Sequence, residues 1–209
     1  MKANRLASTL LLVVAVAAHL PAQQTEADPK LLAEIRAKAE KGDTQSQSEL
    51  GATFFFGNLG VPRDEVEAVK WYRKAAEQND AWAQYNLGFC HASGRGVAKD
   101  YVEAVKWWRK AAEQNDPWAQ NNLGVCYANG DGFGKDYVQT RKWWILAAAQ
   151  GHAGANKALS VIEPQMRKEE ISEAHRLARE FRPSKAPETT EPLTNEQLLD
   201  SRPLRPVAR

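Results

Sequence analysis

A 36-residue unit occurs twice in the middle of the chain in near-identical form. Residues 76–88 read AEQNDAWAQYNLG, and residues 112–124 read AEQNDPWAQNNLG. The second half of the unit recurs as well, because KDYVEAVKWW at 99–108 is followed by KDYVQTRKWW at 135–144. A fixed period of this size is typical of helical hairpins that bury their apolar faces against neighbouring copies. The chain is therefore predicted to be all-α, a right-handed α-solenoid of stacked helix-turn-helix hairpins.

Weaker copies extend the array in both directions. An earlier copy is one residue longer, with the extra residue in the segment 57–61, and a later, decayed copy is followed by no tryptophan. Apolar residues at helical spacing predict one more helix at each end, and Pro164 is expected at the first position of the closing helix. We place the array at 30–182, with repeats at about 39–75, 76–111 and 112–147, a degenerate repeat at 148–163 and a capping helix at 164–182.

Each repeat carries start signals for two helices. Aspartates precede the first and the second helices and are expected to act as N-caps. They are Asp80 and Asp116 for the first helices, and Asp64, Asp100 and Asp136 for the second. A Glu or Gln three residues after each of the last three gives a capping-box spacing. The period also places one tryptophan of each second helix in the core, namely Trp71, Trp107 and Trp143.

The two ends of the chain differ from the array in composition. Lys2 and Arg5 precede an apolar run at 6–20, which is typical of a secretory signal peptide at 1–22 cleaved after Ala22; an uncleaved N-terminal anchor is the alternative. A polar lead follows at 23–29. The tail at 183–209 has five prolines and few aliphatic residues, so we expect it to be disordered. The protein is thus expected to be exported, to a bacterial periplasm or the extracellular space.

Charge and hydropathy exclude two classes of partner. The chain has 28 basic and 26 acidic residues, and the signal contains two of the basic ones, so the mature chain is close to neutral. A basic excess that would hold nucleic acid is therefore missing. No second apolar run approaches the length of a membrane span. We expect a monomer that binds a protein or peptide, without nucleic acid and without a membrane span after signal cleavage.

The repeat resembles the Sel-1-like repeat, a unit related to the tetratricopeptide repeat. The second copy matches the family pattern at Ala83-Gln84, Leu87-Gly88, Gly94-Arg95-Gly96-Val97, Asp100, Ala104, Trp107-Trp108 and Ala111. The third copy departs from it at Phe133, where the family has Val, and at Thr140, where the family has Ala. The resemblance implies an adaptor for protein complexes with no shared catalytic residues.

The two cysteines occupy the same position in successive repeats. Neighbouring stacked helices lie about 8–10 Å apart, whereas a disulfide needs Cα atoms within about 7 Å. Cys90 and Cys126 are therefore predicted to be free, buried thiols rather than a bridge or a metal pair. A cysteine-rich branch of the Sel-1-like family, associated with β-lactam binding and hydrolysis, has a paired Cys in each repeat, and this chain does not. The four histidines show no metal-ligand spacing, and no catalytic motif is present, so we expect neither an enzyme nor a cofactor.

The resemblance also suggests where a ligand would bind. In tetratricopeptide-like stacks the first helices line the concave face, and side chains there that point away from the apolar stripe are candidate contacts. These are Trp82, Tyr85, Asn86 and Phe89 in one repeat, and Trp118, Asn121, Asn122 and Val125 in the next. Asn and Tyr suit an extended peptide because they can donate and accept hydrogen bonds. Trp82 and Trp118 fit either a binding surface or packing on the preceding repeat.

Three functions remain open from the sequence. The first is a secreted or periplasmic scaffold that binds a protein or peptide, favoured by the repeat array, the neutral charge and the missing catalytic motif. The second is a cell-envelope hydrolase related to the cysteine-rich branch. The third is a carbohydrate binder that uses Trp82 and Trp118, because exposed tryptophan stacks on sugar rings.

Overall fold

The computed structural model describes residues 28–184. The predicted signal peptide, most of the polar lead and the tail from residue 185 onward lie outside the described residues. In the described part no helix is long and apolar enough to cross a membrane. All regular structure within 28–184 is helical, which confirms the predicted all-α solenoid.

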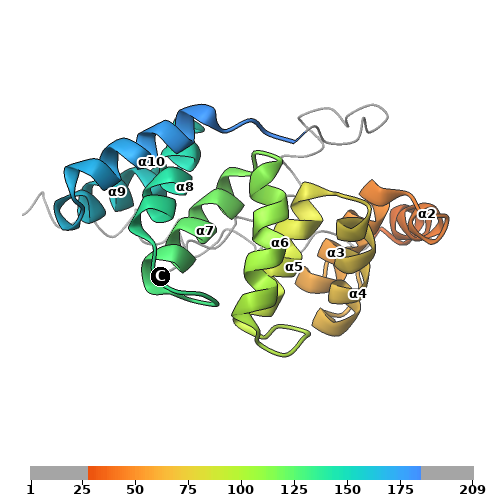
Figure 1. The fold of residues 1–209 in the computed structure, drawn as a ribbon. Helices are drawn as coiled ribbons and strands as arrows, with labels where there is room; N and C mark the ends of the chain where they lie inside the picture. Colours follow the sequence, from red (N-terminus) through yellow and green to blue (C-terminus); the bar gives the residue numbers. More distant parts are fainter. Residues whose placement is uncertain (1–27, 185–209) are drawn as a thin grey trace, which may run out of the picture.

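The helices follow one another as a row of antiparallel hairpins (Figure 1). The elements are α2 (Pro29–Glu40), α3 (Thr44–Phe56), α4 (Glu65–Glu77), α5 (Ala81–Ser93), α6 (Tyr101–Glu113), α7 (Pro117–Asn129), α8 (Tyr137–Ala149), α9 (Ala153–Ile162), the 3-10 helix η1 (Glu163–Gln165) and α10 (Lys168–Glu180). The three full repeats are the pairs α3–α4, α5–α6 and α7–α8. Helix α2 packs on α3 at one end, and α9 and α10 pack on α8 at the other.

The predicted aspartate caps are confirmed. Asp80 and Asp116 accept hydrogen bonds from backbone N–H groups three residues on, at 2.6 and 2.7 Å. Asp64, Asp100 and Asp136 cap the second helices in the same way. The capping-box expectation is wrong for Glu67 and Glu103, which form ion pairs with Lys70 and Lys106 one turn further on. In a capping box that side chain accepts from the N–H group of the capping residue itself. The N–H groups of Asp64, Asp100 and Asp136 donate instead to backbone carbonyls of the first helices, so the expectation is wrong for Gln139 as well.

Within each repeat, an aromatic ring of the second helix lies against a glycine of the first. A Cβ added to Gly88 would lie 2.6 Å from Cδ1 of Trp108, well inside van der Waals contact. The Trp108 Nε1–H donates to the backbone carbonyl of Tyr85 at 3.1 Å. Gly124 and Trp144 repeat the contact in the next hairpin, with Trp144 donating to the carbonyl of Asn121 at 3.2 Å. This contact fixes the two helices of a hairpin at one separation.

Neighbouring repeats are joined by buried glutamines. Gln84 of α5 donates from Nε2 to the carbonyl of Ala76 at 3.1 Å, and its Oε1 accepts from Nε2 of Gln114 at 2.8 Å. Gln120 and Gln150 make the same link one repeat later, also at 2.8 Å. Gln120 is fully buried, so each of its hydrogen bonds replaces one that water would otherwise supply. These hydrogen bonds therefore hold each repeat in the same position relative to its neighbour.

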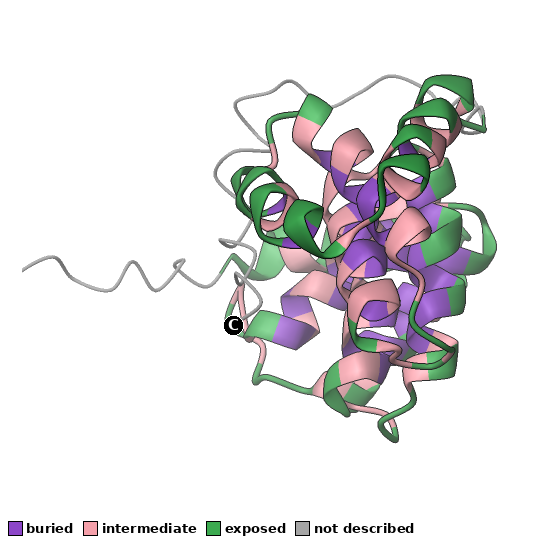
Figure 2. Ribbon diagram, turned by 60° about the vertical axis from the view of Figure 1, so that its left-hand side comes forward, coloured by how far each residue is buried: buried purple, intermediate pink, exposed green. Residues whose placement is uncertain are grey.

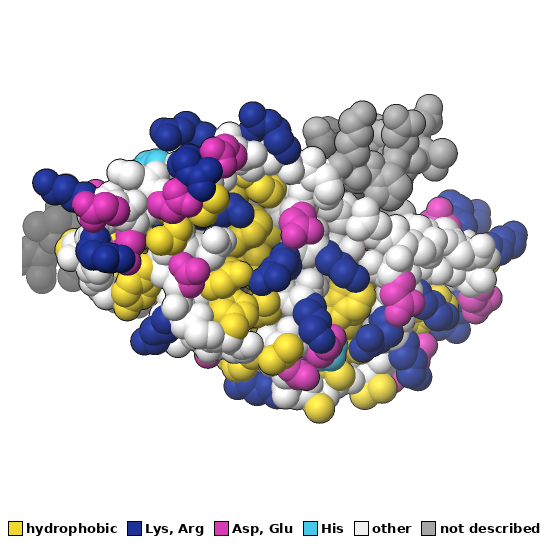
Figure 3. Space-filling model, viewed as in Figure 1, with side chains coloured by type: hydrophobic (Ala, Val, Ile, Leu, Met, Phe, Trp, Pro, Cys, Tyr) yellow, Lys and Arg dark blue, Asp and Glu magenta, His cyan; other side chains and the backbone are white. Residues whose placement is uncertain are grey.

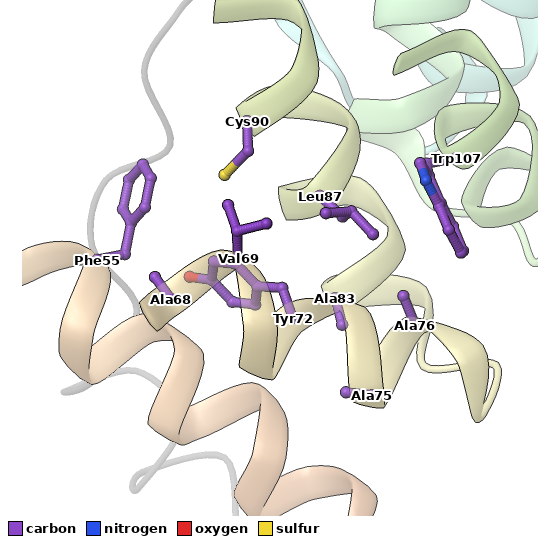
Figure 4. Packing of buried hydrophobic residues seen from close by; sticks show 10 residues of the cluster. All are labelled: Phe55, Ala68, Val69, Tyr72, Ala75, Ala76, Ala83, Leu87, Cys90 and Trp107. Carbon is purple, nitrogen blue, oxygen red and sulfur yellow. The ribbon is translucent and has the colours of Figure 1, made fainter. Parts of the chain in front are cut away.

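Within residues 28–184 the core consists of clusters that follow one another along the stack. Buried residues gather in its interior, with exposed residues on the outer surfaces (Figure 2). Trp71, Trp107 and Trp143 are buried, as the period predicts. One cluster brings together four successive helices, since Phe55 of α3 and Tyr72 of α4 meet Cys90 of α5, and Trp107 of α6 covers its far side (Figure 4). Each helix thus packs both within its hairpin and on the next.

The C-terminal end departs from the prediction. Pro164 lies inside η1, and α10 begins at Lys168, so the expectation that Pro164 opens the closing helix is wrong. The 3-10 turn reverses the chain and lets α10 pack back on α8, where Phe181 contacts Trp143 with ring centroids 5.8 Å apart. After α10 the chain reaches the end of α6, where the Ser184 N–H donates to the Glu113 carbonyl at 2.8 Å.

Replacing Gln120 with Leu tests the glutamine link. The change keeps the side-chain volume but removes the partner of Gln150 and leaves the buried carbonyl of Ala112 without its side-chain donor. We expect the free energy of unfolding to fall by about 1–3 kcal/mol, which is the cost of leaving buried polar groups unpaired. Urea unfolding followed by far-UV circular dichroism measures this. The same change at exposed Gln165 should have an effect within about 0.5 kcal/mol, and equal effects of the two variants would contradict the role of the link.

Candidate binding surface

The predicted first-helix residues are less accessible than expected. Tyr85 is only 4% exposed and packs in the cluster that α5 shares with the following repeat. It was therefore wrongly assigned to an open surface. The physical reason is that α5 has a neighbouring hairpin on each side, so its outward positions are fewer than the spacing of one isolated helix suggests.

The two tryptophans of this set pack on neighbouring elements. The ring of Trp82 lies edge-on to Tyr72 of the preceding repeat, with centroids 5.8 Å apart. Trp118 lies edge-on to His152 at the start of α9, with centroids 4.6 Å apart, and also packs against the core. Both side chains are half-buried. The contact of Trp82 matches packing on the preceding repeat, whereas the ring contact of Trp118 is with the following element.

The remaining predicted residues form a shallow, half-buried strip. Asn86 and Asn122 occupy equivalent positions on α5 and α7, and Asn86 donates from Nδ2 to the Trp82 carbonyl at 2.8 Å. Phe89 contacts Phe55, and Val125 packs on the third cluster. Asn121 supplies the backbone carbonyl that receives the Trp144 indole N–H. Several of these residues therefore have structural partners, and the strip does not converge on one point.

A second feature lies on the second-helix side of the stack, between α6 and the loop that precedes α8. It is a groove of about 490 Å³ along α6. The residues that line it are Val102, Glu103, Val105, Lys106, Trp107, Arg109, Lys110 and Glu113 of α6, with Gly132 and Phe133 of the loop before α8. Figure 3 shows hydrophobic side chains gathered in the middle of this face, with Lys and Arg side chains beside them.

Charged side chains lie along the apolar floor of the groove. Lys110 Nζ lies 4.3 Å from the centroid of the Trp107 ring. Arg109 donates from Nη2 to the Tyr127 hydroxyl at 2.8 Å, and Lys106 pairs with Glu103 at 2.5 Å. Lys142 of α8 is half-buried over Trp143, at 4.2 Å from the ring centroid, and burial lowers its pKa. The groove thus combines aromatic surface with ammonium and guanidinium groups.

None of the binding residues predicted from the sequence lines this groove, although the sequence contains one signal for it. Phe133 stands where the family pattern has Val, and its ring packs on Tyr127 with centroids 4.2 Å apart. The larger side chain of Phe133 lines the groove opposite α6. Gly132 lets the loop approach closely, because a Cβ there would lie 3.0 Å from the Tyr101 carbonyl oxygen and its φ is +81°. The replacement of the consensus Val by Phe133 is therefore the sequence signal for the groove.

Both cysteines and His91 are buried in the part of the chain that the structure describes. Cys90 and Cys126 are buried as free thiols in separate clusters, and burial raises the pKa of each to about 12. Figure 4 shows the Cys90 sulfur directed into the packed side chains of α4. Burial also lowers the pKa of His91, which is 6% exposed. Within 28–184 no three His, Cys, Asp or Glu side chains are grouped as metal ligands would be.

The thiols should resist modification in the folded protein. With a pKa near 12 their thiolate fraction at about pH 8 is roughly a thousandfold below that of an ordinary cysteine. We expect the native protein to react with Ellman's reagent at least about a hundredfold more slowly than protein unfolded in guanidinium. Unreduced, unfolded protein should show two thiols per chain. Rapid reaction of the native protein would contradict the burial, and absence of thiols after unfolding would indicate a disulfide.

Comparison with known proteins agrees with this architecture. A family model described as Sel1 repeat matches residues 44–80, 83–116 and 119–152. The structure is similar to that of a Sel1 repeat protein from Oxalobacter formigenes, with 39% identity and a TM-score of 0.57 over 62% of this chain and 96% of that one. It is also similar to c5321, a protective antigen of uropathogenic Escherichia coli with an SLR fold, with 28% identity and a TM-score of 0.55 over 73% of this chain and 40% of that one. The sequence comparison with curated proteins gave no match. The three matched repeats together span half of the chain and show that it belongs to the Sel1 repeat family.

Proposed function

We propose that this protein is an exported interaction scaffold that binds an extended segment of protein in the groove along α6. The observation that carries the proposal is the combination of an apolar floor, formed by Val105, Trp107 and Phe133, with Lys106, Arg109 and Lys110 beside it. Apolar pockets anchor a bound segment, and Arg and Lys side chains select its charge. Export is proposed from the basic start and apolar run of residues 1–22.

The family supports a scaffold rather than an enzyme. Sel1 repeats form stacked hairpins whose long outer surfaces suit protein interaction. The free thiols are buried and protonated, which gives no nucleophile for a hydrolase. The packing of Trp82 and Trp118 on neighbouring elements favours a peptide over a sugar as ligand, because a sugar platform needs an open ring face.

A peptide-display selection on the immobilised full chain tests the proposal. Selected peptides should lose about tenfold in affinity when Lys106→Glu and Lys110→Glu are introduced together, since two exposed cation contacts become repulsive. The matched control carries Lys41→Glu and Lys157→Glu, two exposed residues outside the groove, and should bind as wild type. The proposal would be contradicted if the affinity of the selected peptides were unchanged by Lys106→Glu with Lys110→Glu but fell with Asn86→Ala and Asn122→Ala. The binding site would then lie on the first helices.

A further inference from the structure

The chain beyond the last described residue starts at one end of the groove. The hydrogen bond from Ser184 to the carbonyl of Glu113 holds the chain at the C-terminal end of α6, and Glu113 itself lines the groove. In Figure 1 the end of α10 and the end of α6 meet at the top of the molecule. Residues 185–209 therefore begin beside the groove and not at a distant part of the stack.

The composition of this tail complements the groove. Its segment 188–200 reads ETTEPLTNEQLLD, which has four acidic residues, no basic residue and three leucines. The groove offers Lys106, Arg109 and Lys110 next to Trp107 and Phe133, and it also contains Glu113 and Glu103, the partner of Lys106, so its lining has one positive charge in excess. Contacts within the fold hold two of these cations in place. Lys110 lies over the Trp107 ring, and Arg109 donates a hydrogen bond to the Tyr127 hydroxyl. An acidic segment with apolar side chains would thus meet the opposite charge and an apolar floor together.

The length of the tail is sufficient for this contact. Three residues lie between Ser184 and Glu188, and an extended chain spans at most about 3.3–3.6 Å per residue. The 13 residues of α6 rise about 20 Å, so the 13 residues of the acidic segment can run along the whole helix with chain to spare. The short connection also makes the contact intramolecular, at an effective concentration of about 1 mM.

We infer that the acidic segment Glu188–Asp200 of this chain occupies the groove along α6 and competes there with other protein segments. The inference rests on the proposed function, because it concerns the same groove, and it names the chemistry of the ligand as an acidic peptide with leucines. If the isolated segment bound the groove with a Kd of about 0.1 mM, an effective concentration of about 1 mM would keep it bound in roughly nine molecules of ten. A competing peptide would then bind about tenfold more weakly than to an open groove.

Fluorescence anisotropy with a labelled synthetic peptide of residues 185–209 tests the inference. The peptide is titrated with the full wild-type chain and with a full-length variant in which Glu188→Gln, Glu191→Gln, Glu196→Gln and Asp200→Asn neutralise the tail. The substitutions lie outside the packed helices, so both proteins share the same folded array. We expect the peptide to bind the neutralised variant about tenfold more tightly than wild type, and salt to weaken this binding by screening. Adding Lys106→Glu and Lys110→Glu to the neutralised variant should abolish it, whereas Lys41→Glu and Lys157→Glu should not.

Other outcomes separate this inference from the proposed function. Equal binding to wild type and to the neutralised variant, sensitive to Lys106→Glu and Lys110→Glu, would overturn occupation by the tail and leave the groove as a peptide site. No binding to either protein, while display-selected peptides still bind at the groove, would overturn the acidic ligand but not the scaffold. Binding unaffected by the groove substitutions would overturn the inference as well, because the tail would then contact another surface.

Discussion

The structure depends on the close approach of an aromatic ring to a glycine inside each hairpin. Trp108 and Trp144 occupy the space that a side chain at Gly88 or Gly124 would need, and their indole N–H groups donate to backbone carbonyls of the same first helices. The contact therefore sets both the separation of the two helices and their relative rotation. In the first repeat Tyr72 takes the aromatic position against Gly51. Trp107 and Trp143 can then pack on the preceding repeat, since their neighbours in sequence already contact the first helix of the same hairpin.

Buried glutamines hold successive hairpins in the same relative arrangement along the chain. Each glutamine pair crosses from one repeat to the next, so a displaced hairpin would leave polar groups buried without partners. At the C-terminal end the pattern changes. Buried Arg141 reaches Glu163 at 3.2 Å and joins α8 to the turn before α10. The return of α10 over α8 closes the stack and brings the end of the described chain to α6. The groove itself is formed by α6 and by the loop that carries Phe133.

Much of the fold follows from the sequence, because the repeat imposes the same local signals several times. The aspartate caps, the buried tryptophans and the order of the hairpins were all predicted from spacing alone. Tyr85 was placed on an open face because helical spacing shows which residues share a side but not whether another repeat covers it. Pro164 was placed one element too late, because a proline at a first helical position suits η1 as well as α10. The groove depends on how the loop at 130–134 packs beside α6 of the preceding repeat, and helical periodicity carries no information on that packing.

Replacing Gly88 with Ala, compared with the same change at Gly134, tests the central claim most directly. Helix propensity alone predicts that Ala at position 88 stabilises the fold by up to about 1 kcal/mol. The contact with Trp108 predicts the opposite sign, because overpacking costs about 1–3 kcal/mol and the displaced indole loses its hydrogen bond, worth about 1 kcal/mol. Gly134 has no atom within 4 Å of an added Cβ, so its change should be close to neutral. Urea unfolding should show Gly88→Ala destabilised by at least about 1 kcal/mol relative to wild type. A Gly88→Ala protein as stable as wild type, or more stable, would contradict the account.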